Sequence, residues 1–199
     1  MMTIPSTLTN LVGKKLILGS NSPRRQELLR GLGLEFDIRV HPIAEELPAD
    51  LPAQYAAAYL SKLKADAFPS PLEANEILIT ADTVVIDRGK VLAKPANELE
   101  AFEMLKSLSG TTHTVMTAVT LKDHKTSVTL EDETQVTFRF LEEEEIWYYL
   151  NNYQPYDKAG SYGIQEWIGF VGVNSISGSY FTVMGFPLHL VYAQLKKWI

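Results

Sequence analysis

The stretch from Lys15 to Gly33 constrains the fold of this chain more than any other. Residues 15–18 form a short, mainly apolar run that predicts a buried strand. Ser22 and Pro23 then follow as the N-cap and the first residue of a helix. Leucines give that helix a buried face, and the glycines at its far end stop it. The sequence therefore predicts a strand, a tight turn and a helix.

Two arginines, Arg24 and Arg25, stand in the first turn of this predicted helix. The helix dipole favours negative charge there, so local propensity does not account for them. An anionic ligand would account for them, because backbone N–H groups and two guanidinium groups would converge on it. The alternative is an exposed pair on an ordinary helix, since arginine is common on protein surfaces. Spacing alone leaves both interpretations open.

The other predicted elements mix strand–helix units with a hairpin, so the sheet is expected to be mixed. Predicted strands lie at 36–40, 76–86 and 91–95, in a hairpin of 112–121 and 127–140, and at 167–175 and 179–184. Further predicted helices begin near Asp50, Asn97, Glu142 and Pro187. No internal repeat or linker divides the chain, which indicates one domain over 15–199.

Length, charge and composition exclude several classes of protein. The chain has 199 residues, enough for one domain with a full core. No apolar run approaches the ~20 residues of a membrane span, and no membrane partner is expected. A net charge of −6 argues against a nucleic-acid polymer as partner, but a small phosphorylated ligand needs only a local cationic pocket.

Residues 1–14 lack the apolar centre of a secretion signal and are expected to be a loose N-terminal lead-in.

The chain has no cysteine, which excludes disulfides and thiolate metal sites and is consistent with a cytoplasmic location. His113 has no partner histidine nearby, which favours a hydrogen-bonded structural role over a zinc ligand.

Asp82 is the most informative polar residue, because it interrupts an apolar strand. A carboxylate in such a place is costly unless it is paired or bound to a metal ion. Lys64 and Lys94 could supply the pair, as in a structural ion pair, or hold phosphate oxygens as point charges. Glu45 and Glu46 are either a solvated pair or metal ligands, since Mg²⁺ often takes one or two carboxylates and completes its shell with phosphate.

Several motifs in unbroken order resemble one family, the Maf (septum formation) family of nucleoside triphosphate pyrophosphatases. The resemblance covers about residues 15–199. It is carried by the motifs at residues 20–29, 45–46, 64–65, 81–85, 94–95, 109–113, 157–165, 178–180 and 185–188. The loop from Lys158 to Gln165 is similar to that of the dTTP/UTP branch. Directly after Gln165 the family usually has a glycine, whereas this chain continues with Glu166 and Trp167.

The resemblance implies an α/β fold with an elongated mixed β-sheet flanked by helices and two lobes around a cleft, similar to inosine triphosphate pyrophosphatases. It implies release of pyrophosphate from a nucleoside triphosphate, with a divalent cation, Mg²⁺ or Mn²⁺, as cofactor. It leaves a homodimer open. Two alternatives remain: a nucleotide-binding regulator of cell-division arrest with little turnover, and a pyrophosphatase with another base preference, such as 7-methyl-GTP.

The resemblance also implies residue roles. Asp82 would accept the proton of the attacking water. Substrate specificity would rest on Arg24, Thr83 and Gln165. Phosphate binding or another polar role in the site would rest on Ser22, Arg25, Lys64, Lys94 and Lys158. The metal ion would be held by Glu46, Asp82 and Glu45.

Overall fold

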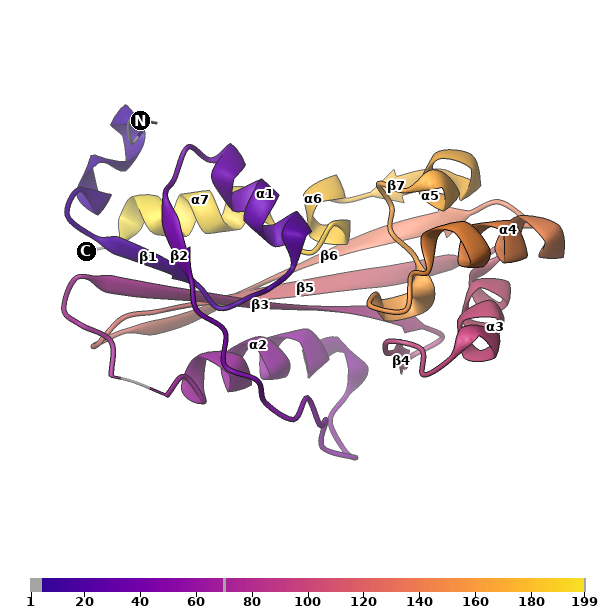
Figure 1. Ribbon diagram of the computed structural model, residues 1–199, viewed down its shortest axis with the longest axis horizontal. Coiled ribbons are helices and arrows are strands. Elements are labelled where there is room, and N and C mark those ends of the chain that lie inside the picture. The colour runs from indigo at the N-terminus through magenta and orange to yellow at the C-terminus, as the bar shows by residue number, and fades with distance from the viewer. Residues whose placement is uncertain (1–4, 70, 199) are drawn as a thin grey trace.

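A single mixed sheet runs the length of the molecule, in a computed structural model that describes residues 5–69 and 71–198 (Figure 1). Its seven strands follow the order β2-β1-β3-β5-β6-β7, with β4 paired to β3. β1 is parallel to β2 and to β3, and the remaining pairs are antiparallel. The strands are β1 (Lys15–Leu18), β2 (Phe36–Ile38), β3 (Glu76–Asp87), β4 (Lys90–Leu92), β5 (Thr112–Lys122), β6 (Ser127–Phe138) and β7 (Val173–Ser177).

Helices cover the sheet in two groups, one toward each end. The α-helices are α1 (Pro23–Gly31), α2 (Ala56–Asp66), α3 (Glu98–Leu108), α4 (Glu143–Tyr153), α5 (Trp167–Gly172), α6 (Tyr180–Val183) and α7 (Leu188–Lys197). Short 3₁₀ turns are η1 (Ser6–Leu11), η2 (Ala53–Tyr55) and η3 (Ala159–Ser161). In Figure 1, α1 and α7 lie on one side of the sheet and α2 on the other, whereas α3, α4 and α5 gather at the far end.

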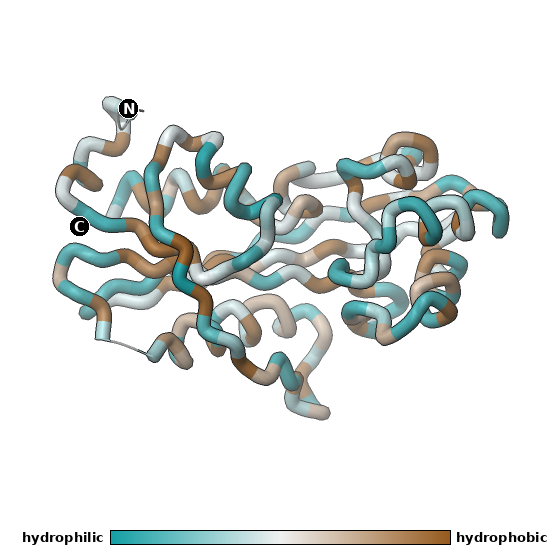
Figure 2. Tube along the Cα trace, viewed as in Figure 1, coloured by the Kyte–Doolittle hydropathy of each residue, from teal (hydrophilic) through white to brown (hydrophobic). Residues whose placement is uncertain are grey.

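Two large hydrophobic cores lie toward the two ends of the sheet, and a smaller one lies between α2 and the sheet. The first core packs β1, α1 and α7 against β3 and β5, and Phe186 is its largest fully buried side chain. The second packs α3, α4 and α5 around Phe138 and Tyr149. Hydrophobic residues run along β1 and the adjoining part of β3, as Figure 2 shows. The expectation of an elongated mixed α/β sheet flanked by helices is confirmed.

Local signals placed several elements correctly. Ser22 caps α1 and Pro23 is its first residue, as predicted. Asn97 caps α3 through the amide N–H of Glu100. The Glu100 carboxylate accepts a hydrogen bond in return from the amide of Ala96, one residue before the cap.

Two strand predictions are wrong. The first six residues of segment 167–175 form helix α5, and only Val173 onward forms a strand, β7. The segment 179–184 contains the helical turn α6 instead of a strand. Both segments are rich in aromatic and β-branched residues, which favour strands locally, but burial of Ile168 and Gly172 in the second core selects the helix.

The N-terminal segment is held against α7. Leu8 and Leu11 are buried in the first core. The Asn10 side-chain amide donates to the carbonyl groups of Leu195 and Trp198, at 2.9 and 2.8 Å. The prediction of a loose N-terminal lead-in is therefore wrong for residues 5–14, which pack against the first core. Residues 1–4 lie outside the described residues. No described helix is both long enough and apolar enough to cross a membrane.

Candidate active site

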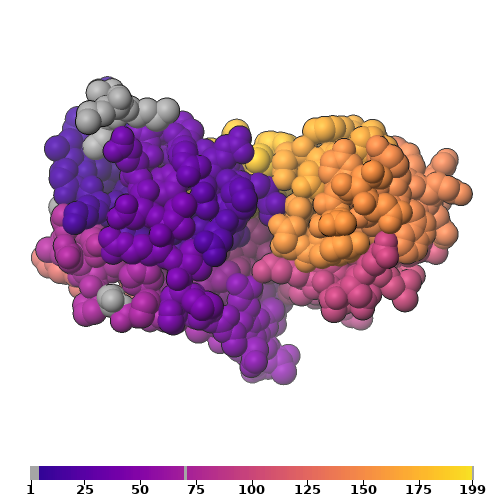
Figure 3. Space-filling model, viewed as in Figure 1, coloured from indigo at the N-terminus to yellow at the C-terminus, as the bar shows by residue number. Residues whose placement is uncertain are grey.

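A cleft of about 700 Å³ opens between the two cores, at the middle of the sheet. Figure 3 shows the N-terminal part of the chain, in indigo and purple, on one side of the molecule and the segment around residue 160, in orange, on the other. The predicted site residues that line the cleft are Ser22, Arg24, Arg25, Glu45, Lys64, Asp82, Thr83, Lys94, Lys158 and Gln165. Glu46 does not line it, and its side chain is exposed. The structure therefore brings the predicted residues together, with Glu45 in the cleft and Glu46 outside it.

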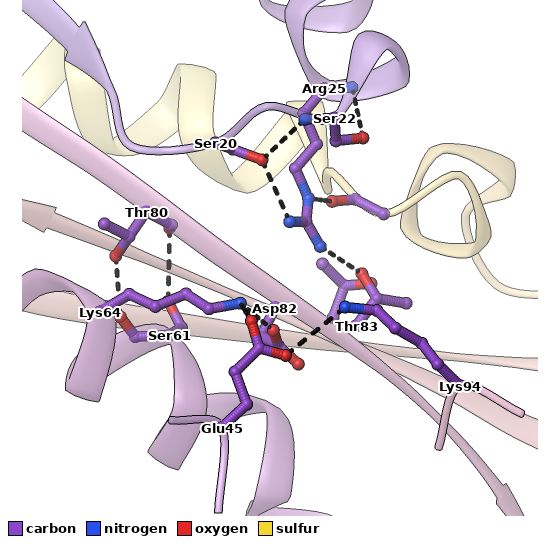
Figure 4. A network of polar contacts seen from close by, with 12 residues as sticks. Ser20, Ser22, Arg25, Glu45, Ser61, Lys64, Thr80, Asp82, Thr83 and Lys94 are labelled. Atoms are coloured by element: carbon purple, nitrogen blue, oxygen red, sulfur yellow. Dashed lines mark hydrogen bonds and ion pairs between the residues drawn. The ribbon is translucent and has the colours of Figure 1, made fainter. Parts of the chain in front are cut away.

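The register of α2 on β3 places a lysine opposite Asp82. The Ser61 hydroxyl on α2 donates to the carbonyl of Thr80 on β3, and the Thr80 hydroxyl donates to the carbonyl of Ser61, at 2.8 Å. Lys64 lies one helical turn after Ser61, and Asp82 lies two residues after Thr80 on the same strand face. These paired bonds therefore direct the Lys64 ammonium at the buried Asp82 carboxylate, which it contacts (Figure 4).

Glu45 joins the same cluster from the loop before α2. Its carboxylate is 2.8 Å from the Lys64 ammonium and 3.5 Å from the Lys94 ammonium. Partial burial acts to raise the pKa of Glu45, but the two lysines outweigh it and hold that pKa below its ordinary value. The cluster thus presents alternating charges along one wall of the cleft.

Arg25 ties the start of α1 to the rest of the site. Its guanidinium donates to the carbonyl of Gly185 at 2.9 Å, to the hydroxyl of Thr83 at 3.1 Å and to the hydroxyl of Ser20 at 3.4 Å (Figure 4). Burial lowers the pKa of Arg25, and the nearby Asp82 carboxylate acts in the opposite direction. Arg25 is therefore not a residue of an exposed arginine pair, and these bonds compensate for its unfavourable position at the helix N-terminus.

Arg24 points toward the opposite wall. One terminal guanidinium nitrogen lies 3.9 Å from the carboxylate of Asp157. Partial burial acts to raise the pKa of Asp157, while Lys158 and Arg24 lower it below its ordinary value. The two walls of the cleft therefore meet through opposite charges at its rim.

The opposite wall is the irregular segment 154–166, which carries Gln165. Gly160 has a φ of +67°, and a Cβ atom there would come within 2.9 Å of Val85. This close approach of the segment to β3 therefore requires glycine. Behind the wall, the Lys158 ammonium contacts the carboxylates of Asp157 at 2.8 Å and Glu166 at 3.1 Å.

Sequence reasoning did not identify Thr117 or Tyr149 as part of the site's support. The Thr117 hydroxyl lies 3.0 Å from that of Thr83 and donates to the carbonyl of Thr182 at 2.7 Å. The Tyr149 hydroxyl contacts the Glu166 carboxylate. Tyr149 lies in the apolar stripe of α4, so its spacing indicates a core residue and gives no sign of its polar partner.

The donor set of the cleft suits a hard divalent cation. Within residues 5–69 and 71–198, no cluster of three or more His, Cys, Asp or Glu side chains is suited to hold a metal ion. Asp82 and Glu45 both face the cleft and share the contact with Lys64. Two carboxylates beside an open cleft fit a Mg²⁺ or Mn²⁺ ion that takes its other oxygens from a phosphate substrate and water.

Comparison with known proteins places this cleft in context. A family model described as Maf-like protein matches residues 15–198. A Flavobacterium johnsoniae protein named dTTP/UTP pyrophosphatase is 49% identical over 181 residues, which cover 91% of this chain and 93% of that protein. A Bacteroides thetaiotaomicron protein of the same name is 49% identical over 191 residues, covering 96% and 99%.

Among solved structures, a nucleoside-triphosphatase / dITP/XTP pyrophosphatase from Mycobacterium abscessus has a TM-score of 0.35 and 14% sequence identity. The match covers 62% of this chain and 74% of that one. The family match over nearly the whole chain, together with near-full-length relatives at 49% identity, settles the affiliation. The chain belongs to the family of Maf-like proteins.

Proposed function

We propose that the chain hydrolyses nucleoside triphosphates, with dTTP and UTP preferred, to the nucleoside monophosphate and pyrophosphate. The observation that carries this proposal is the buried Asp82 carboxylate, which lines a cleft that also holds Arg24 and several lysines. The names of the 49% identical relatives support the same substrates. A cytoplasmic role in nucleotide-pool housekeeping follows from this activity.

Asp82 is the group suited to accept a proton from an attacking water. A general base must lie within hydrogen-bond reach of that water, and Asp82 lines the cleft. Lys64 fixes the orientation of its carboxylate through direct contact. Thr83, the next residue on β3, holds Arg25 in place and so keeps the start of α1 against the cleft.

The triphosphate is expected to lie along the cationic side of the cleft. The backbone N–H groups at the start of α1, the Arg24 guanidinium and the Lys94 ammonium would neutralise its charge. Asp82 and Glu45 would hold a Mg²⁺ or Mn²⁺ ion, which supplies neutralisation of the pyrophosphate leaving group. Glu46, one residue further along, stays a predicted ligand.

Gln165 is suited to read the base. Thymine and uracil present an N3–H donor between two carbonyl acceptors, and a side-chain amide can satisfy one donor and one acceptor. Cytosine replaces one acceptor with an amino donor and lacks the N3 hydrogen, so the same amide would face mismatched groups. A site that buries such groups rejects the wrong base strongly because they are left unpaired.

The substrate experiment measures kcat/KM for dTTP, UTP, CTP, ATP, GTP and 7-methyl-GTP, with pyrophosphate detected through an added inorganic pyrophosphatase. We expect dTTP and UTP to be cleaved fastest, and Gln165→Ala to reduce that preference. Equal values for all bases would contradict the base preference. Binding of dTTP without turnover would instead support the regulatory alternative.

Metal dependence is tested separately. We expect activity to require added Mg²⁺ or Mn²⁺ and to disappear with excess chelator, because the cleft offers carboxylate oxygens and no thiolates. Restoring the metal should restore the rate, which controls for damage by the chelator. Full activity in excess chelator would contradict a metal cofactor.

A further inference from the structure

A polar cluster lies behind the wall of the cleft that carries Gln165. The Tyr149 hydroxyl on α4 donates to the Glu166 carboxylate. The same hydroxyl oxygen accepts a hydrogen bond from the Gly163 amide at 3.0 Å. The other Glu166 oxygen lies 3.1 Å from the Lys158 ammonium. Glu166 and Tyr149 do not line the cleft, whereas Lys158, Gly163 and Gln165 do.

This cluster holds both ends of the turn that contains Gln165. The Glu166 amide donates to the Gly163 carbonyl at 3.0 Å, which closes a turn over residues 163–166. The Gly163 amide is held by Tyr149, and the Glu166 side chain is held by the same hydroxyl. The Glu166 carbonyl accepts from the amides of Gly169 and Phe170, which joins the turn to α5. Gln165 therefore lies between two fixed points.

Tyr149 is buried and Glu166 is half-buried, and neither residue lines the cleft. Tyr149 has no exposed surface, and 19% of the Glu166 side chain is exposed. Burial raises the pKa of Tyr149, and the Glu166 carboxylate raises it further, so the tyrosine stays a proton donor at neutral pH. Gly163 has no side chain, and a Cβ atom there would come within 2.7 Å of the Glu166 carboxyl carbon. The glycine thus leaves room for the carboxylate directly beneath the turn.

We propose that Tyr149 and Glu166 are positioning residues for base selection, which hold the turn 163–166 so that the Gln165 amide presents a fixed donor and acceptor to the nucleobase. The inference rests on the proposed hydrolysis of dTTP and UTP. Discrimination between similar bases requires the reading group to stay in place, because an amide that can rotate or shift satisfies the wrong base as well. The cluster supplies that restraint without touching the substrate.

The first test is Tyr149→Phe, which keeps the ring in the second core and removes the hydroxyl. We expect the ratio of kcat/KM for dTTP to that for CTP to fall about tenfold, the effect of losing one hydrogen bond to a charged group. The loss should appear mainly as a higher KM for dTTP, with kcat for CTP unchanged. Tyr153→Phe is the matched control, because Tyr153 lies on the same helix with an exposed side chain.

The second variant, Glu166→Gln, keeps an acceptor for Tyr149 and removes the charge that faces Lys158. It should lower the same ratio, and the double variant should lose less than the product of the two single losses, because both act through one cluster. Glu144→Gln on the exposed face of α4 serves as its control. Because the side chain of Glu166 is partly exposed, this variant tests the inference even where Tyr149→Phe fails to fold.

The outcomes separate this inference from the proposed function. A wild-type protein that cleaves none of the nucleotides, or cleaves dTTP and CTP equally, overturns the proposed function. A wild type that prefers dTTP while both folded variants keep the same ratio overturns the inference alone. An equal fall in kcat for all nucleotides at a constant ratio shows a general structural role and also overturns it.

Discussion

The two walls of the cleft are built differently. On one wall, Lys64, Asp82 and Arg25 project directly from α2, β3 and α1, whose backbone groups are already paired within regular structure. On the other, Gln165 belongs to an irregular segment, and the groups that hold it lie behind it in the second core. Irregular backbone pairs only part of its polar groups within itself, and here the Gly163 amide finds its partner in the Tyr149 hydroxyl. The charged side chains of the cleft thus project from helices and a strand, whereas Gln165 depends on hydrogen bonds made by buried polar side chains behind its segment.

The largest expected effect is the loss of turnover when Asp82, on the wall formed by helices and β3, is replaced. Asp82→Asn should lower kcat about 10²–10⁴-fold, because a general base typically contributes that much. The fold should persist, because the amide keeps the size of the carboxylate and β3 keeps its pairing with β5 at this position. Steady-state kinetics with a circular dichroism spectrum check this. Asp37→Asn, at an exposed site, is the control, and wild-type turnover in folded Asp82→Asn would contradict the role of Asp82.

A smaller effect is expected from His113, which contacts Tyr162 in the irregular segment 154–166. His113 is buried, its Nε2 atom lies 2.7 Å from the Tyr162 hydroxyl, and its Nδ1 atom has no hydrogen-bond partner in the described part of the chain. Burial lowers the pKa of His113 from 6.5 to about 4. Below pH 6.5 the unfolded chain protonates His113, whereas the folded chain does so only near pH 4. Acidification toward pH 4 should therefore lower the contribution of His113 to the free energy of unfolding by about 3 kcal/mol.

Urea unfolding across this pH range measures the effect. His113→Gln should flatten the dependence between its folded and unfolded pKa values, while His124→Gln, at an exposed position, should leave it unchanged. Parallel profiles for the wild type and His113→Gln would show that the buried imidazole does not destabilise this wall in acid.

The smallest effect concerns the local signal that starts α1. Ser22 accepts a hydrogen bond from the Arg25 amide, so Ser22→Ala should lower the free energy of unfolding by about 1 kcal/mol. Pro23 still favours the helix start, so the helix should remain. Urea midpoints compared with Ser127→Ala, at an exposed position at the start of β6, provide the measurement. A loss as large as that expected for His113 in acid would mean that this wall also depends on buried polar support.

The sequence predicted well where local rules decide the structure. The cap at Ser22, the glycine that ends α1 and the hairpin of β5 and β6 depend on residues close together in the sequence, and the structure follows these predictions. Asp82 was recognisable because a carboxylate in an apolar strand is costly. These features of the sequence predicted the position of Asp82 and of the start of α1, which lie on the same wall of the cleft.

Prediction failed where packing between distant segments decides. Phe170 and its β-branched neighbours favour a strand locally, but the segment forms helix α5 and packs Ile168 into the second core. Glu45 and Glu46 are identical neighbours in a loop, so no periodicity indicates which one faces Lys64. Tyr149 has the spacing of an ordinary core residue, and its bond to Glu166 joins positions 17 apart in the sequence.

The length of β3 has a consequence for how the molecule moves. Ala81 of β3 lies in the first core and Val85 in the second, and β5 follows the same course through Val119 and Val115. A continuous hydrogen-bonded ladder between the two strands spans the floor of the cleft. Rotation of the first core against the second would break hydrogen bonds of that ladder. We therefore expect β3 and β5 to hold the two cores in a fixed relative orientation. Adjustment to an incoming nucleotide is therefore left to irregular backbone outside the sheet, such as the segment 39–52 between β2 and η2.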